Sequence, residues 1–593
     1  MKRRRAVLAM ALGAVTALSS IGLTGCGGSK ASSDNSYSVW IYNGADASYY
    51  TEYEDNPVVQ YLTKDKTWGD EDKTISFDYW QPAAGTQQDN YQTMIASGDL
   101  PDVISGYIAG TLGTMLENGN AIDLTDYIKK DMPNYLAFLD ANPTLKKDAV
   151  TKIDGEDHYI GILSGCDAVD YYFTGMEYRR DWIVKYGTNP QTGEKFTGGY
   201  TDKNDPDSWE DDVVFPSGGT DPVYISDWEW MFDIFTKAQK DLGITESYSI
   251  SMYYPGFTWS GGLCSSFGEG VPVWYEDSNG QVKFGGTEDS MRAYLECLNN
   301  WYDKGWLDQD FYQRTSDAFY EIDDTNVRQG KVGMWQGVES ELGGRLDSGD
   351  ELTKGICVYG CALPINDVYG SDSCKNIEPM SVMASSQGGT FWYVTPTAED
   401  KDIDTLLQFF DYFYSEEGAL LHTLGLNKEQ AADDSTGIYE ENGLSDGAYT
   451  DNGDGTYTVN PVLTKDSGNL APAVSLAQVP GIQLVKNIDR GWADTYKHSK
   501  DTWIQWENKG MFQGSAVTLN MTSDEESTCD TARSKVLDYM QTNAAEFIRG
   551  KKDINSDTDW NTWCKSLTKF GIDKISTIYQ PYVDEYGYNA SAQ

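Results

Sequence analysis

The sequence contains few of the side chains on which most catalytic sites depend. Its 593 residues include three histidines, His158, His422 and His498, which lie far apart along the chain. It has no Gly-x-Ser-x-Gly elbow and no zinc-binding His-Glu-x-x-His helix, so serine triads and zinc-dependent hydrolysis lack a supporting motif. Cys-x-x-Cys spacings are also missing, which argues against a structural zinc site.

Positive charge is scarce as well. The chain has 45 Lys and Arg against 92 Asp and Glu, a formal net charge of −47, and the acidic residues are spread along its whole length. Such a surface repels the phosphates of nucleic acid, which excludes nucleic acid as a partner. Beyond the N-terminus no apolar run approaches the ~20 residues that a membrane-spanning helix needs. We find no internal repeat.

The N-terminus has the pattern of an export signal. Lys2 and Arg3 to Arg5 precede an uncharged apolar stretch at 6–22, and Leu-Thr-Gly then leads to Cys26. That layout predicts a cleaved signal peptide at 1–25, and its end resembles the lipobox of bacterial lipoproteins, in which the cysteine receives the lipid. Two acyl chains hold a protein at a bilayer where one does not. We therefore expect Cys26 to be lipidated and residues 26–36 to form a flexible tether. An uncleaved membrane helix or a signal peptide without lipid is the alternative.

The rest of the chain alternates between the strand and helix periods. Residues 38–43 and 74–79 are predicted to be strands, 89–96 a helix with Gly98 as its left-handed cap, and the residues from Asp102 a third strand. Strand and helix in alternation predict an α/β domain with a largely parallel sheet. Helices are also expected at 226–241, 291–304, 397–422, 530–549, 560–570 and 574–586, and surface loops at 188–224 and 427–463.

Aromatic residues are abundant, with 40 Tyr, 18 Trp and 19 Phe. In the simplest interpretation these residues fill the hydrophobic core. In a more specific interpretation some of them line a carbohydrate-binding site, because sugar rings stack on aromatic rings. Eight cysteines follow Cys26, an even number that permits disulfides in an exported protein, although a chain of this size does not need them.

Four segments resemble one protein family in the same order along the chain. The Ala-Ser-Gly-Asp-Leu-Pro-Asp-Val segment at 96–103 is similar to a marker of the extracellular solute-binding proteins of ABC importers, in particular the large oligosaccharide-binding lipoproteins of Gram-positive bacteria (family 1, aldouronate-type). The Arg-x-Asp-Trp block at 179–182, the Gly-Lys-x-x-Met strand at 330–334 and the helix at 415–421 resemble further blocks of that family. The run that follows Gly425 departs from the family pattern.

The resemblance implies a two-lobed, periplasmic-binding-protein-like α/β fold of type II, with hinge crossovers and a ligand cleft between the lobes. Residues 37–165 with 356–426 would form the first lobe, and 166–355 with 427–593 the second. The implied protein is a non-catalytic monomer, anchored by its lipid on the extracellular face of the cell membrane. It would capture a carbohydrate, most simply an oligosaccharide, for the permease subunits of an ABC transporter.

Candidate ligand-binding residues follow the predicted strands, because cleft walls in such folds are built from the turns after strands. The aromatic loop at 253–259 is the leading stacking platform, since its Pro and Gly suit neither helix nor strand. A place in the core is the alternative for each aromatic candidate, and a structural ion pair is the alternative for Arg180. The candidates are Trp40, Asn43, Trp80, Tyr107, Glu177, Arg180, Tyr254, Trp259, Trp335 and Trp392.

Two other functions fit the same sequence. An extracellular glycoside hydrolase needs two acidic side chains about 5–10 Å apart, and a surface receptor for a sensor kinase would share the fold. No cofactor is predicted. Calcium is the alternative at the acidic stretches 202–207 and 553–559, although Pro206 and Thr558 stand where a calcium loop needs a ligand and a glycine. A solvated loop and a helix N-cap explain the two stretches equally simply.

Overall fold

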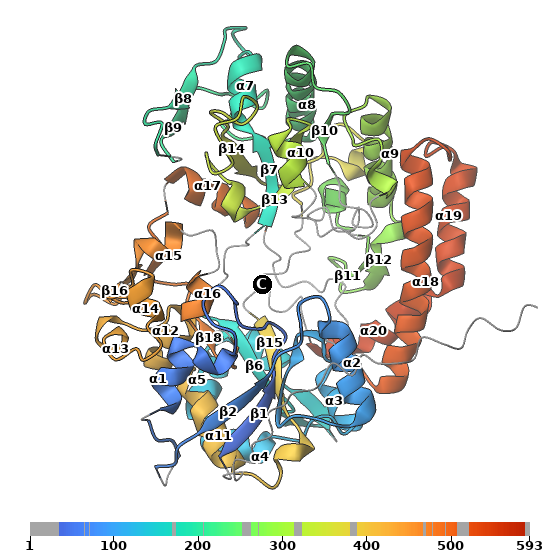
Figure 1. The fold of residues 1–593 in the computed structure, drawn as a ribbon. Coiled ribbons are helices and arrows are strands. Elements are labelled where there is room, and N and C mark those ends of the chain that lie inside the picture. Colours follow the sequence, from blue (N-terminus) through green and yellow to red (C-terminus); the bar gives the residue numbers. More distant parts are fainter. Residues whose placement is uncertain are drawn as a thin grey trace, which may run out of the picture.

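The structure is a computed structural model. It describes residues 35–64, 66–69, 72–153, 155–168, 174–205, 207–251, 263–270, 272–313, 323–379, 388–465, 470–476, 478–492, 494–506 and 521–586. These residues form two α/β lobes, each built on its own sheet, one above the other in Figure 1. The predicted fold class is confirmed.

The first sheet has six strands in the order β18-β6-β15-β3-β1-β2. Strand β1 pairs in parallel with both β2 and β3, and β15 runs antiparallel between β3 and β6. The mainly parallel sheet matches the alternation of strand and helix along the N-terminal sequence. The strands are β1 (Ser36–Trp40), β2 (Ser76–Trp80), β3 (Val103–Ser105), β6 (Ile162–Cys166), β15 (Gly388–Val394) and β18 (Ile482–Gln483).

Helices and small strands cover this sheet and complete the first lobe. The helices are α1 (Pro57–Thr63), α2 (Gln87–Ser97), α3 (Leu112–Glu117), α4 (Thr125–Asp131), α5 (Pro133–Ala141), α6 (Pro143–Asp148), α11 (Ile403–Tyr412), α12 (Glu416–Thr423), α13 (Lys428–Ala431), α14 (Ile438–Glu441), α15 (Pro461–Lys465) and α16 (Leu470–Val474). The small strands are β4 (Thr151–Ile153), β5 (Glu156–His158), β16 (Tyr449–Asp451), β17 (Tyr457–Val459) and β19 (Ile488–Asp489).

The end of α2 illustrates how local sequence sets these boundaries. Gly98 has φ 70°, in the left-handed region, and its N–H donates to the carbonyls of Met94 and Ile95. Glycine carries no Cβ penalty in that conformation, and Pro101 prevents the helix from resuming before β3. The predicted helix cap at Gly98 is confirmed.

The second lobe is built on a four-stranded sheet in the order β10-β13-β7-β14. Here β7 (Thr174–Arg179) runs antiparallel between β13 (Val332–Val338) and β14 (Val358–Cys361), and β10 (Tyr248–Ile250) is parallel to β13. Its other elements are α7 (Arg180–Tyr186), β8 (Gly198–Tyr200), β9 (Trp209–Asp211), α8 (Ile225–Asp241), β11 (Trp274–Glu276), β12 (Val282–Phe284), α9 (Asp289–Asp303), α10 (Asp323–Arg328) and α17 (Asp494–Trp503).

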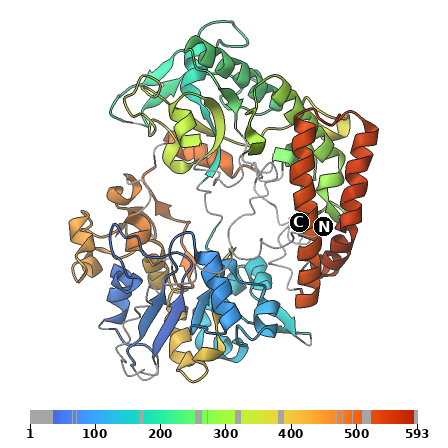
Figure 2. The same ribbon diagram turned by 45° about the vertical axis from the view of Figure 1, so that its right-hand side comes forward.

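Three C-terminal helices, α18 (Ser523–Ile548), α19 (Asp557–Phe570) and α20 (Ile572–Tyr586), stand along one side of the molecule (Figures 1 and 2). Helix α18 packs on α9 of the second lobe, and it also contacts α3 of the first lobe. It begins seven residues before the predicted start, because Thr522 and Glu525 form a capping box there. One helix therefore touches both lobes.

The strand pairing corrects the predicted lobe boundaries. Strand β14 pairs with β7, so residues 358–361 belong to the second lobe and not to the first. Strand β18 pairs with β6, so residues 482–483 belong to the first lobe and not to the second. The boundaries depend on which distant strands meet, and helical or strand periodicity carries no such information.

Three local predictions also differ from the structure. The expected surface loop at 427–463 contains core residues, since Tyr439 is buried and its hydroxyl bonds the backbone of Leu426 and Val474. The helix expected at 397–422 is two helices, because the Ser415 hydroxyl caps a new one. The helix expected at 226–241 begins at Ile225 instead, with Tyr224 at its N-cap.

None of the eight cysteines that the structure describes forms a disulfide. Seven of them are buried, so they fill the core as thiols, and burial raises the pKa of Cys529 to about 11. Across the described ranges no helix is both long and apolar enough to cross a membrane. The predicted signal peptide and Cys26 lie outside the described residues.

Candidate functional site

One edge of the first sheet collects the carboxyl ends of its parallel strands. Trp40, at the end of β1, pairs with Trp80, at the end of β2, and with Ile104 in β3. Strand β15, which enters from the second lobe, starts at this same edge, because Gly388 lies opposite Gly165 of β6. The turns that follow β1, β2 and β3 therefore lie where the chain crosses between the lobes.

An aromatic pair is exposed at this edge. The rings of Tyr42 and Tyr107 lie 4.2 Å apart between centroids, at an interplanar angle of 32°. Tyr42 is half-buried and packs in the small cluster around Trp40, whereas Tyr107 is 63% exposed. A large aromatic ring held in place by a second ring while one of its faces meets solvent is suited to stacking against a ligand.

Polar and half-buried groups border the aromatic pair. Asn43 is exposed in the turn after β1, and Trp80 is half-buried with its Nε1 donating to Asp78 at 3.3 Å. The Gln81 Oε1 accepts the backbone N–H of Ala45 at 2.8 Å, which ties the turns after β1 and β2 together. The structure thus brings three predicted residues, Asn43, Trp80 and Tyr107, to one edge of one sheet.

Trp40 and Trp392 lie beneath this edge, inside the lobe. Trp40 is 1% exposed, and its Nε1 donates to the Asn90 Oδ1 at 2.8 Å. Trp392 is buried in the main core of the first lobe, opposite Ser105 of β3 and Ile162 of β6. Their positions favour the core alternative, and a contact of either side chain with a ligand stays a prediction.

The second sheet turns a corresponding edge toward the first lobe. Strand β7 begins at Thr174 after the crossing from β6, and Thr174 pairs with Val338, the last residue of β13. Glu339 follows directly, and its carboxylate accepts from the ammonium of Lys500 on α17. The Glu339 side chain is 40% exposed and that of Lys500 is 3% exposed, so the carboxylate is the outward member of the ion pair.

Trp492 completes this group. The Lys500 ammonium lies 4.9 Å from the centroid of the Trp492 ring, which is half-buried and packs against the cluster around Trp335. Sequence reasoning missed all three residues. Glu339 directly follows β13, but the strand predicted from the sequence ends at 334, so the turn after it was placed too early. Lys500 and Trp492 had no usable signal, because nothing local shows that α17 packs on the sheet of the second lobe.

Arg180 is a predicted ligand contact, but its guanidinium bonds other residues of the protein. Its guanidinium donates two bonds to Asp211, at 2.8 and 2.7 Å, and further bonds to the Tyr178 hydroxyl and the Thr220 carbonyl. Burial alone would raise the pKa of Asp211, but the bonds and charge of Arg180 hold it below its ordinary value. This is a buried structural ion pair, the alternative reading of Arg180.

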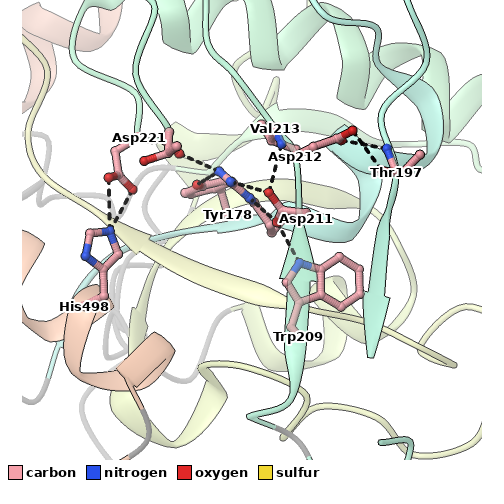
Figure 3. A network of polar contacts seen from close by, with 10 residues as sticks. Tyr178, Thr197, Trp209, Asp211, Asp212, Val213, Asp221 and His498 are labelled. Atoms are coloured by element: carbon pink, nitrogen blue, oxygen red, sulfur yellow. Dashed lines mark hydrogen bonds and ion pairs between the residues drawn. The ribbon is translucent and has the colours of Figure 1, made fainter. Parts of the chain in front are cut away.

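Figure 3 shows the surroundings of that pair, with Tyr178, Trp209 and Asp211 in one network and His498 beside Asp221. The Trp209 Nε1 donates to Asp211 at 2.7 Å, and the His498 Nε2 lies 3.0 Å from both Asp221 oxygens. The hydrogen bond to Asp221 raises the pKa of His498. Because His498 is on α17, this contact fixes the helix to the second lobe.

Glu177 and Trp335 lie under α17 in the second sheet. Both side chains are fully buried, and the Trp335 Nε1 donates to the Glu341 Oε2 at 3.0 Å. Neither carboxyl oxygen of Glu177 has a hydrogen-bond partner among the described residues. Burial, followed by the nearby Glu341, raises the pKa of Glu177 well above its ordinary value. Their burial favours a structural role, and a ligand contact for either stays a prediction.

The aromatic loop at 253–259, with Tyr254 and Trp259, lies outside the described residues. No group of three or more His, Cys, Asp or Glu in the described part of the chain is arranged to hold a metal ion. In the stretch 553–559 Ser556 caps α19, the Asp559 carboxylate accepts the N–H of Asp553, and Asp557 pairs with Arg292. Asp207 of the other acidic stretch pairs with Arg345.

The chain matches known proteins by its structure and not by its sequence. No family model matches the sequence, and no curated protein matches it in a sequence search. An extracellular solute-binding protein from Bifidobacterium longum subsp. infantis has a TM-score of 0.65 and 18% identity, over 93% of this chain and 98% of that one.

Two further structures agree. The substrate-binding protein FusA of an S. pneumoniae ABC transporter, in complex with kestose, has a TM-score of 0.62 and 15% identity over 93% of this chain and 99% of its own. The alginate-binding protein AlgQ2 has a TM-score of 0.60 and 17% identity over 93% and 98%. Over nearly its whole length, this chain therefore has the two-lobed fold of the substrate-binding proteins of ABC transporters.

Proposed function

We propose that the chain is an extracellular solute-binding protein that captures an oligosaccharide between its lobes and delivers it to the permease subunits of an ABC transporter. The exposed Tyr42–Tyr107 pair carries this proposal, because it offers a sugar ring an aromatic face at the edge of the first sheet. The fold supports it, since structures bound to kestose or named for binding alginate share that fold.

The proposed mechanism is closure of the two lobes around the ligand. A ligand that contacts both sheet edges favours the closed state by its differential affinity for that state, and the closed state is what a transporter recognises. The chain acts without catalysis and as a monomer in this proposal. The lipid on Cys26 keeps it on the outer face of the membrane, and the tether at 26–36 lets it reach the permease.

Calorimetry and thermal shift of the mature protein against a panel of neutral and acidic oligosaccharides test the binding function. Saturable binding without any change in the saccharide is expected, and release of shorter products would show that the protein is a glycoside hydrolase instead.

Replacing Tyr107 by Ala removes the exposed ring and should weaken binding roughly 3- to 10-fold, as expected for losing ~0.5–1.5 kcal/mol of aromatic contact. Tyr107→Phe keeps the ring and is the matched control.

The anchor has its own test. Labelling cells with an alkyne analogue of palmitate should modify the wild-type protein, and Cys26→Ser should abolish the label and release the protein into the medium. A Cys26→Ser variant that remains in the membrane fraction would show that another segment retains it.

A further inference from the structure

The polar group at the edge of the second sheet, Glu339, Lys500 and Trp492, has features of a contact site that its packing does not explain. Lys500 is buried and would need a carboxylate partner in any case. Its partner Glu339, however, directs a 40% exposed carboxylate outward from the end of β13, beside the half-buried ring of Trp492. Such an arrangement leaves acceptor capacity on Glu339 that Lys500 does not use.

Its place in the fold puts this carboxylate opposite the aromatic pair of the first lobe. Glu339 is one residue beyond Val338, which pairs with Thr174 where the chain enters the second lobe. Tyr107 is two residues beyond the end of β3, at the edge where β15 enters the first lobe. A ligand that spans the lobes therefore meets an aromatic face on one side and a carboxylate on the other.

The charges around this edge decide which saccharides are accepted. Four cations that the second lobe places near β7, β13 and α17 are each held by a carboxylate of the protein, whereas the Arg490 guanidinium lies on the Trp492 ring, 5.6 Å from its centroid. The pairs are Lys500–Glu339, Arg180–Asp211, Arg179–Asp181 and Arg345–Asp207. Glu341 lies buried two residues beyond Glu339, and the chain as a whole carries a formal charge of −47.

We propose that Glu339, with Lys500 and Trp492, forms a second-lobe subsite that selects neutral oligosaccharides over those that carry carboxylates. The Glu339 carboxylate accepts hydrogen bonds from sugar hydroxyls, Lys500 fixes the carboxylate in position, and the Trp492 ring packs against the sugar. A uronic acid at the same place would bring its carboxylate close to that of Glu339, and the repulsion between the two negative charges would weaken binding. This inference rests on the proposed function and adds the charge class of its ligand.

Calorimetry with matched saccharides tests the selectivity. The probes are 1-kestose, maltotriose, xylotriose and mannotriose as neutral trisaccharides, together with trigalacturonate and its neutral methyl ester. We expect at least one neutral trisaccharide to bind at least tenfold more tightly than trigalacturonate, with an affinity that does not change between 20 and about 300 mM salt, because a neutral ligand has no charge to screen. Trigalacturonate binding as tightly as the best neutral probe would overturn the inference and leave the proposed function standing. Binding of no saccharide at all would overturn both.

Substitution tests the residue assignment. Glu339→Gln should weaken the best neutral ligand about 10- to 100-fold, the range expected for a hydrogen bond to a charged group. Because this change leaves Lys500 buried without its partner, the Glu339→Gln/Lys500→Met double variant is measured beside it and should show the same loss. Glu351→Gln, an exposed carboxylate in the loop before β14, is the control and should leave affinity unchanged. Unchanged affinity in the folded double variant would refute the assignment.

Discussion

The buried carboxyl of Glu177 predicts a stability that falls as pH rises. Its two oxygens have no hydrogen-bond partner among the described residues, and the side chain is fully buried in the second sheet. The groups that face it are acidic or neutral: Glu341 from the turn after β13, Cys361 from β14 and Tyr496 from α17. Nothing there compensates a negative charge, so we expect Glu177 to be protonated in the folded protein near neutral pH.

The sign of the effect follows from linkage. The folded-state pKa of Glu177 is raised above the value of the unfolded chain, about 4.3. Between these two values the folded protein binds one proton more than the unfolded chain, so the free energy of unfolding decreases by about 1.4 kcal/mol for each pH unit of increase. From pH 5 to pH 7 this single group removes at most about 3 kcal/mol of stability.

Glu177→Gln isolates that contribution, because the amide has nearly the same shape and does not titrate. We would measure the melting temperatures of the wild type and the variant at pH 5, 6 and 7. The two values should be close at pH 5, and the variant should have the increasingly higher melting temperature toward pH 7. Glu351→Gln, which removes an exposed carboxylate, should show no such trend. A difference between Glu177→Gln and wild type that is independent of pH, or a wild type that is the more stable at pH 7, would refute the reasoning.

Two further substitutions test the packing of the second lobe. Arg180→Met leaves the carboxylate of Asp211 buried without its counter-ion and should destabilise the protein by about 3–5 kcal/mol in denaturant unfolding, whereas a loss below about 1 kcal/mol would mean that water replaces the guanidinium. Gly175→Ala would place a Cβ 2.3 Å from the Trp503 ring and so force α17 away from the sheet, which should lower the melting temperature and cost about 1–3 kcal/mol. Gly219→Ala, whose Cβ would meet no atom closer than 3.7 Å, should leave the melting temperature unchanged and serves as the control.

Local patterns predicted the elements of the fold but not their partners. The strand at β1, the helix at α2 and its Gly98 cap follow from periodicity and glycine chemistry within a few residues of sequence. The lobe boundaries do not, because the assignment of β14 to one sheet and β18 to the other depends on pairing with strands more than a hundred residues away.

The candidate site divides in the same way. Tyr107 and Asn43 follow strands, Trp80 ends one, and all three lie at the sheet edge that the turn rule indicates. Arg180 also follows a strand directly, yet its guanidinium is bonded to Asp211, thirty-one residues further along the chain. Lys500 reaches Glu339 from a helix 161 residues further along the chain. The exposure of a side chain depends on such distant partners, and no spacing within the sequence encodes them.

The position of β15 has a consequence for how the protein is made. In the first sheet this strand lies between β6 and β3, although it is the fifth of the six strands in chain order. The two parts of the sheet therefore have no hydrogen bonds to each other until residues 388–394 have been synthesised and have found both neighbours. Closing contacts over such long chain separations slows folding. For the export that we propose, this delay is favourable, because the sheet of the first lobe cannot be completed while only the first 380 residues have been made.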